Sequence, residues 1–138
     1  MKQFTSKIKI SSSGLKIQNI TYQVNQGVTE SNIENGILNL SILNTTASLI
    51  VQENADPDVL LDIENFFKKL VPMNAKYNHF SEGKDDMPAH IKSVLTNTNL
   101  SLSIIDGEIQ LGIWQGIYLF EHREVRKNRI ILLHIIGK

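Results

Sequence analysis

The chain has 138 residues, of which 41% are hydrophobic, and this length suits one domain over residues 1–138 with a sizeable core. Its 14 basic and 14 acidic residues cancel, so no excess of charge points to nucleic acid or a membrane surface as a partner. The absence of cysteine excludes disulfides, thiolate metal sites and cysteine nucleophiles.

Two strands and a helix are predicted near the N-terminus. Residues 2–10 alternate loosely between apolar and polar, and residues 15–20 follow a turn rich in serine and glycine, which together indicate a hairpin. Thr21 offers a cap for a short helix over residues 22–32. Gly27 lowers the helix propensity of this segment.

Two further strands follow, over residues 36–43 and 46–52. Extending the alternation of the first strand puts Asn44 on its apolar face, and Glu53 ends the apolar face of the second. An acidic residue at such a strand end is either a rim residue or a site residue, and the pattern alone does not discriminate.

The clearest helix in the sequence covers residues 56–70. Asp56 suits the N-cap and Pro57 the first helical position. An apolar stripe at helical spacing predicts that one side of this helix packs in the core: Val59, Leu60, Ile63, Phe66, Phe67 and Leu70.

A shorter helix is predicted after Pro88, which the first turn of a helix tolerates. Its expected buried face consists of Met87, Ile91, Val94 and Leu95. His90 lies three residues after Met87 and four before Val94, so it leans toward that face.

The C-terminal part predicts two pairs of strands. Residues 100–105 and 108–112 flank Asp106-Gly107, which is a strong short hairpin signal. Residues 114–122 and 128–136 are expected to form a last pair around a charged loop.

The last strand is apolar on both faces, which predicts a position inside the sheet and a structural role for His134. No linker or repeat interrupts the chain. We therefore expect an α+β single domain, a largely antiparallel β-sheet sandwich of about eight strands with two or three covering helices. No apolar run approaches the ~20 residues of a membrane span and no secretory leader is visible, so a cytoplasmic protein with no membrane partner is expected.

Residues 77–91 concentrate the groups that could carry chemistry. They hold two of the four histidines, His79 and His90, with Glu82, Asp85 and Asp86 between them. Such a set could bind a divalent metal or perform acid–base chemistry near neutral pH. The interval between the histidines is too long for one helix face, so a solvated acidic turn beside a structural histidine is an equal alternative.

Several motifs resemble the YjbQ family, also called the secondary thiamine-phosphate synthase family. They cover the chain in order, at residues 45–49, 53–59, 77–79, 82–92 and 112–117, with Glu121-His122-Arg123 and Arg129 near the C-terminus. Ordered motifs along the whole chain are more specific than any one of them.

The resemblance implies a compact α+β domain that assembles as a homotrimer and a weak thiamine-phosphate synthase activity. That transferase reaction joins a pyrimidine pyrophosphate to a thiazole phosphate and releases pyrophosphate, whose charge a divalent ion such as Mg²⁺ or Zn²⁺ would neutralise. The implied catalytic residues are His79, His90 and Glu53, and the two histidines are also the implied metal ligands. The implied ligand-binding positions are Asn44, Asn54, Asp56, Gly83, Asp85, Trp114, Gln115 and Glu121.

One position departs from the family pattern, which has histidine where this chain has Asn44. Asparagine cannot shuttle a proton near pH 7 and is a poor zinc ligand. Three hypotheses therefore remain: an enzyme of the thiamine-phosphate-synthase type, a non-catalytic binding protein for a phosphorylated or anionic metabolite or a metal ion, and a protein with a vestigial pocket that serves a partner. We expect Asn44, Glu53, His79 and His90 to line one pocket.

Overall fold

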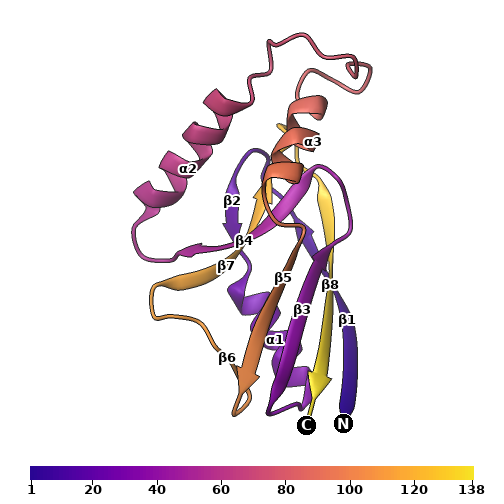
Figure 1. Cartoon of the computed structure of the whole chain (residues 1–138), viewed down its shortest axis with the longest axis vertical. Coiled ribbons are helices and arrows are strands. Elements are labelled where there is room, and N and C mark those ends of the chain that lie inside the picture. Colours follow the sequence, from indigo (N-terminus) through magenta and orange to yellow (C-terminus); the bar gives the residue numbers. More distant parts are fainter.

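The computed structural model describes residues 1–138 and contains eight strands and three helices (Figure 1). In chain order they are β1 (Lys2–Ser11), β2 (Ile17–Asn19), α1 (Thr21–Ser31), β3 (Gly36–Ile42), β4 (Ala47–Glu53), α2 (Pro57–Leu70), α3 (Asp86–Leu95), β5 (Asn99–Ile105), β6 (Glu108–Ile109), β7 (Gln115–Glu121) and β8 (Asn128–Gly137). All strand pairs are antiparallel and form two sheets, ordered β1-β8-β3-β5-β6 and β2-β7-β4. The predicted α+β class is confirmed.

The hydrophobic core lies between the two sheets and α1. Leu40 from β3, Leu49 from β4 and Leu133 from β8 belong to it and are fully buried. Gly27 explains how α1 approaches β8, because a Cβ atom there would lie 2.6 Å from Cδ1 of Leu133. The glycine that weakens the helix locally therefore permits its packing.

The local turn and cap signals are confirmed. The β5–β6 hairpin turns at Asp106 and Gly107, whose φ angles are 52° and 78°, the left-handed conformation that a tight hairpin turn needs. Asp56 caps α2 by accepting a hydrogen bond from the backbone N–H of Asp58 at 2.9 Å. β8 lies between β1 and β3, as its two apolar faces predict.

Two predicted strand pairings are wrong: the N-terminal hairpin and the pairing of the last two strands. β1 pairs with β8 and β2 pairs with β7, so the N-terminal hairpin does not exist, and β7 and β8 lie in different sheets. Two connecting segments cross side by side between the sheets: Ser12 N–H donates to the Lys127 carbonyl, and Leu15 N–H donates to the Arg123 carbonyl. Periodicity locates strands but does not tell which sheet they join.

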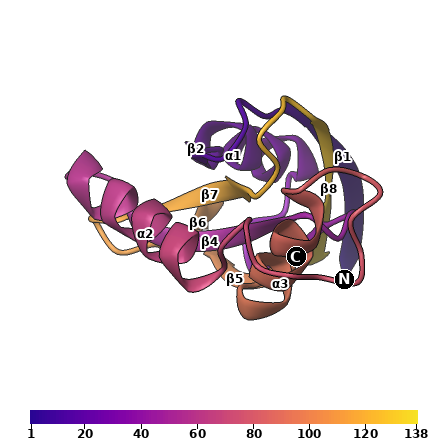
Figure 2. The ribbon, with the colours of Figure 1, turned by 90° about the horizontal axis from the view of Figure 1, so that it is seen from above.

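The predicted burial of α2 is also wrong for the single chain. No residue of α2 is buried, and Phe66 and Leu70 are 59% and 53% exposed. α2 packs beside β4 at the edge of the smaller sheet, and Figure 2 shows it to one side of the molecule. Phe67 makes its main aromatic contact, edge-on to Phe120 with ring centroids 5.4 Å apart.

The face that α3 turns inward differs from the predicted one. Val94 and Leu95 are 83% and 54% exposed, whereas Asp86, Lys92 and Ser93 are buried. The helix therefore covers β4 partly with polar groups, and the Ser93 hydroxyl, for example, donates to the Ala47 carbonyl. The rule that places apolar positions inside fails here because buried ion pairs hold the start of the helix.

Candidate metal and ligand site

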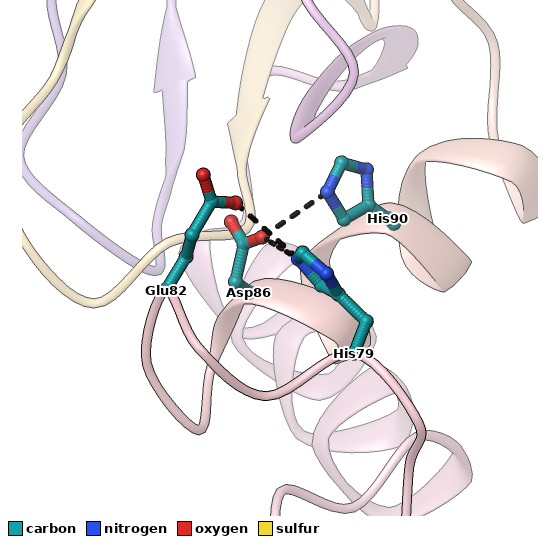
Figure 3. A group of neighbouring side chains, drawn as sticks. All are labelled: His79, Glu82, Asp86 and His90. Carbon is teal, nitrogen blue, oxygen red and sulfur yellow. Dashed lines mark hydrogen bonds and ion pairs between the residues drawn. The ribbon is translucent and has the colours of Figure 1, made fainter.

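Four side chains meet where the loop after α2 enters α3: His79, Glu82, Asp86 and His90 (Figure 3). Nε2 of His79 lies 2.6 Å and Nε2 of His90 3.2 Å from Oδ2 of Asp86. Glu82 approaches from the other side, with Oε2 3.3 Å from Nε2 of His79. One donor atom from each residue lies within 4.8 Å of all the others.

Local structure explains this convergence. Asp86 and His90 are four residues apart on α3, so they share a helix face. The loop returns to the helix through Gly83, whose φ of 110° is strained for any other residue. The N–H of Gly83 donates to Phe80, and the Gly83 carbonyl accepts from Asp86. Gly83, a predicted ligand position, therefore shapes the loop.

Arg123 holds the carboxylates of Asp85 and Asp86 in place. Its Nε donates to Asp85 at 2.9 Å, its Nη1 pairs with Oδ1 of Asp86 at 2.7 Å, and its Nη2 donates to the Glu82 carbonyl. Asp85 also accepts from the backbone N–H of Glu124. Asp85 is thus committed to Arg123, while Oδ2 of Asp86 remains directed at the histidines.

Charge within the cluster follows from these contacts. The hydrogen bond to Asp86 raises the pKa of His79 above its usual 6.5. Burial acts to raise the pKa of Asp86, but the His79 hydrogen bond and the Arg123 charge outweigh it, so the net pKa is lowered. The hydrogen bond to Asp85 raises the pKa of Arg123. The resting cluster is therefore an ionised carboxylate beside an easily protonated imidazole.

The donor set fits a divalent transition ion. Two imidazole nitrogens with two carboxylate oxygens suit zinc and similar metals, whereas magnesium prefers oxygen ligands alone. Four ligands around zinc lie ~3.3 Å from one another, given bonds of ~2 Å. The observed spread of up to 4.8 Å needs only side-chain movement, which the exposure of Glu82 allows. The ion pair with Arg123 already holds the Asp86 carboxylate in a fixed orientation, as a partner behind a metal ligand would.

Asn44 lies beside the cluster, in a pocket of about 450 Å³ that His90 also lines. Oδ1 of Asn44 accepts from the backbone N–H groups of Thr46 and Ala47, at 3.0 and 2.8 Å. These bonds hold the turn between β3 and β4 and occupy the oxygen that a metal would need. The structure thus brings Asn44 and His90 together, with Asn44 on the pocket wall.

Other predicted site residues gather at the opposite end of β4. Glu53 accepts from the Ala55 N–H, and Asn54 donates to the carbonyls of Ile113 and Gln115. Oε1 of Gln115 accepts from the Gly112 N–H at 2.6 Å. Glu53 ends the seven-residue strand at whose start the Asn44 turn lies, ~20 Å away. Glu53 therefore does not share a pocket with the histidines within one chain.

The remaining predicted residues have structural partners. Asp56 caps α2, and Trp114, which is 62% exposed, accepts a hydrogen bond from the Asn54 N–H through its backbone carbonyl. Glu121 is buried and forms a double ion pair with Arg129, whose Nε donates to Oε1 at 2.7 Å. Arg129 also donates to Thr46, which ties β8 to the start of β4.

The sequence placed Arg123 in a C-terminal motif and Asp86 among possible carboxylate ligands, but it did not predict that Arg123 pairs with Asp86 or that both histidines contact this aspartate. The spacing of Asp86 and His90 on one helix was an available signal, because four residues place both side chains on one face. Nothing in the sequence predicted that Arg123, 38 residues after Asp85, would bridge both aspartates.

Comparison with known proteins agrees with this fold. Residues 6–138 match the model of the family described as UPF0047 protein YjbQ-like. The UPF0047 protein sll1880 of Synechocystis sp. is 41% identical over 99% of this chain and 94% of its own, and the UPF0047 protein YjbQ of Salmonella typhimurium is 53% identical over 77% of each. The crystal structure of a YbjQ-like protein of unknown function from Sulfolobus solfataricus covers 99% of each chain with a TM-score of 0.91 and 25% identity.

Proposed function

This chain belongs to the YjbQ-like UPF0047 family, and on that premise we propose that it binds a divalent metal ion at His79, Glu82, Asp86 and His90 and uses it to hold an anionic small molecule. The observation that carries the proposal is the meeting of four ligand atoms from a loop and a helix within 4.8 Å. None of the three helices combines the length and the hydropathy that a membrane-spanning helix needs. A cytoplasmic location stays a prediction.

A bound ion would supply charge neutralisation for an anionic ligand or leaving group. His79 and His90 would hold the ion through Nε2, since both of these nitrogens already face the same oxygen, Oδ2 of Asp86. Asp86 would keep its orientation through Arg123. With its raised pKa, His79 could also retain a proton near neutral pH when no ion is bound.

The reaction proposed on the family resemblance is thiamine-phosphate synthesis. Purified protein incubated with the pyrimidine pyrophosphate, the thiazole phosphate and Zn²⁺, Mn²⁺ or Mg²⁺ should form thiamine phosphate and release pyrophosphate. His90→Ala should abolish this turnover without unfolding the chain, because the His90 side chain is 32% exposed. Turnover that is unchanged in His90→Ala would contradict a catalytic role for the cluster.

Binding without turnover is the second candidate, and two contacts favour it. The guanidinium of Arg123 is committed to Asp85 and Asp86, and the oxygen of Asn44 is committed to the turn. The lining of the pocket next to His90 also contains no Lys or Arg, so it offers no side-chain cation for the second phosphate of a pyrophosphate. Equilibrium binding of the substrates with no product would support this candidate. Neither binding nor turnover would favour a vestigial pocket.

We also propose that the chain forms a homotrimer. Two apolar surfaces support association: the outer face of the larger sheet, where Ile37 and Ile136 are 59% and 45% exposed, and the uncovered side of α2 around Phe66. Light scattering at micromolar concentration should return three times the 15.6 kDa chain mass. A monomer mass would refute the assembly.

A further inference from the structure

The pocket beside His90 has a lining that selects ligands by hydrogen bonding. It is formed by the β3–β4 turn, the end of α3 and the segment before β5, and its volume of about 450 Å³ suits a small molecule. His90 belongs to this lining and to the metal cluster. A ligand in the pocket would therefore extend directly from the ion.

Three polar side chains of the lining have capacity left for a ligand. Nδ2 of Asn44 is buried and has no hydrogen-bond partner, although Oδ1 of the same amide accepts two. A buried donor without an acceptor is unfavourable, so an acceptor atom of a ligand that reached Nδ2 would gain a hydrogen bond. The hydroxyls of Thr45 and Thr98 lie at the surface and make no hydrogen bond within the chain, unlike Thr96, which donates to the Lys92 carbonyl.

The lining carries no Lys, Arg, Asp or Glu. Arg123 is held by Asp85 and Asp86, so it does not supply a charge to the pocket. A charged group placed here would lose hydration without gaining a partner, whereas hydroxyl and carbonyl groups would gain hydrogen bonds. One end of the ligand would thus be anionic, at the metal, and the rest uncharged.

We propose that this pocket binds the uncharged, hydroxyl-bearing body of a small acid whose anionic group is held by the metal ion at His79 and His90. This inference rests on the proposed function and adds the ligand class to it. Thr45, Thr98 and the Asn44 amide recognise the body of the ligand. An apolar body, or one that ends in a second negative charge, fits less well.

The test uses the full chain loaded with Co²⁺, whose visible absorption reports a change of its ligands. Gluconate, hexanoate and adipate have carbon chains of equal length, with a hydroxylated, an apolar and a second anionic body. Lactate controls for chelation by a carboxylate and its neighbouring hydroxyl alone. Gluconate should bind at least about five-fold more tightly than each of the other three, since it gains hydrogen bonds in the pocket.

Substitutions in the pocket test whether its side chains cause the tighter binding of gluconate. Thr98→Val and Thr45→Val should each weaken gluconate about five-fold and leave lactate and cobalt affinity unchanged. Asn44→Asp keeps the acceptor that holds the turn but removes the N–H donor, and it should weaken gluconate at least as much. Thr5→Val, an exposed threonine of β1 remote from the pocket, should change nothing.

Two failures can be told apart. If Co²⁺ binds but gluconate shows no advantage, or its advantage survives Thr98→Val and Thr45→Val, the ligand class is wrong while the metal site stands. If Co²⁺ does not bind at the histidines, the proposed function falls and this inference falls with it.

Discussion

His79 and His90 point their Nε2 atoms at one carboxylate oxygen, Oδ2 of Asp86, and their ring centroids are 5.5 Å apart. One ring comes from a loop and the other from α3, so tertiary structure creates this arrangement. A structural histidine needs only one partner for each ring nitrogen. These two rings, Asp86 and Glu82 place four potential ligand atoms within 4.8 Å of one another, and the proposed metal site rests on this arrangement.

The first prediction concerns the protonation of His79. Its pKa should lie above 6.5, because the hydrogen bond to Asp86 favours the imidazolium. Asp86→Asn should lower it toward 6.5. Histidine proton resonances followed by NMR from pH 5 to 9 would show both, and a wild-type midpoint at or below 6.5 would contradict the assigned contact.

The same contact predicts the direction of a stability change. Because the folded pKa of His79 is raised, its contribution to stability is full below the unfolded pKa of 6.5 and is lost as pH rises through the folded value. The difference in unfolding free energy between wild type and Asp86→Asn should therefore be larger at pH 6 than at pH 9. Denaturant titrations at the two pH values measure it, and equal differences would count against the pair.

The second prediction concerns His122, which is buried with Nε2 2.9 Å from the Ser48 hydroxyl. Burial, and then the charges of Lys92 and Arg129, lower its pKa to about 3. The folded chain keeps this ring neutral, whereas the unfolded chain protonates it below pH 6.5, so stability is lost as pH falls from about 6.5 toward 3. The contribution is about 1.4 kcal/mol per pH unit within that window.

Denaturant titrations at pH 6, 5 and 4 check the His122 prediction. His122→Gln removes the titrating group and should show a shallower fall in unfolding free energy than the wild type. Parallel pH dependences in the two proteins would mean that His122 does not stay neutral in the folded state.

The third prediction compares two neighbouring rings of α2. Phe66 is 59% exposed, so Phe66→Ala should reduce the unfolding free energy of the single chain by less than about 1 kcal/mol. Phe67 packs edge-on against Phe120, and Phe67→Ala should cost about 2 kcal/mol. If Phe66→Ala is the more costly and also lowers the mass seen by light scattering, a second copy of the chain covers the stripe.

The fourth prediction concerns Asn44→His. The substitution removes the acceptor for the Thr46 and Ala47 N–H groups and should cost about 1–2 kcal/mol of stability. It also places an imidazole next to His90, so zinc affinity should rise. Denaturant titration and zinc titration measure the two effects separately. Unchanged zinc affinity in a folded variant would exclude this position from the metal environment.

The sequence predicted best what depends on neighbouring residues. Asp56 and Pro57 start α2, and Asp106-Gly107 turns the β5–β6 hairpin, because caps and tight turns are decided within a few residues. The two-sided apolar pattern of β8 correctly placed it inside a sheet. Of the four residues expected in one pocket, Asn44 and His90 line it and Glu53 and His79 do not, and α3 turns inward a different face from the one on which the expectation for His90 rested.

Properties that depend on distant partners were not predictable. The pairing of β1 with β8 requires contacts between the two ends of the chain, which no local pattern encodes. The apolar stripe of α2 was expected to pack in the core, but Phe66 is 59% exposed, because helical spacing defines an apolar face and not the surface it meets. Glu53 was wrongly expected beside the histidines, because strand alternation tells on which face of the sheet a side chain lies. It does not tell which end of the strand lies near the site, and Glu53 lies at the far end of β4.

Zinc binding by matched variants tests the central claim most directly. Equilibrium dialysis of the wild type should give about one zinc ion per chain at saturation, and His90→Ala and Asp86→Asn should each weaken zinc binding at least about ten-fold. His134→Ala, which removes a histidine of the larger sheet outside the cluster, should bind as the wild type does. A wild type that binds no zinc, or one whose affinity is unchanged in both cluster variants, would contradict the account.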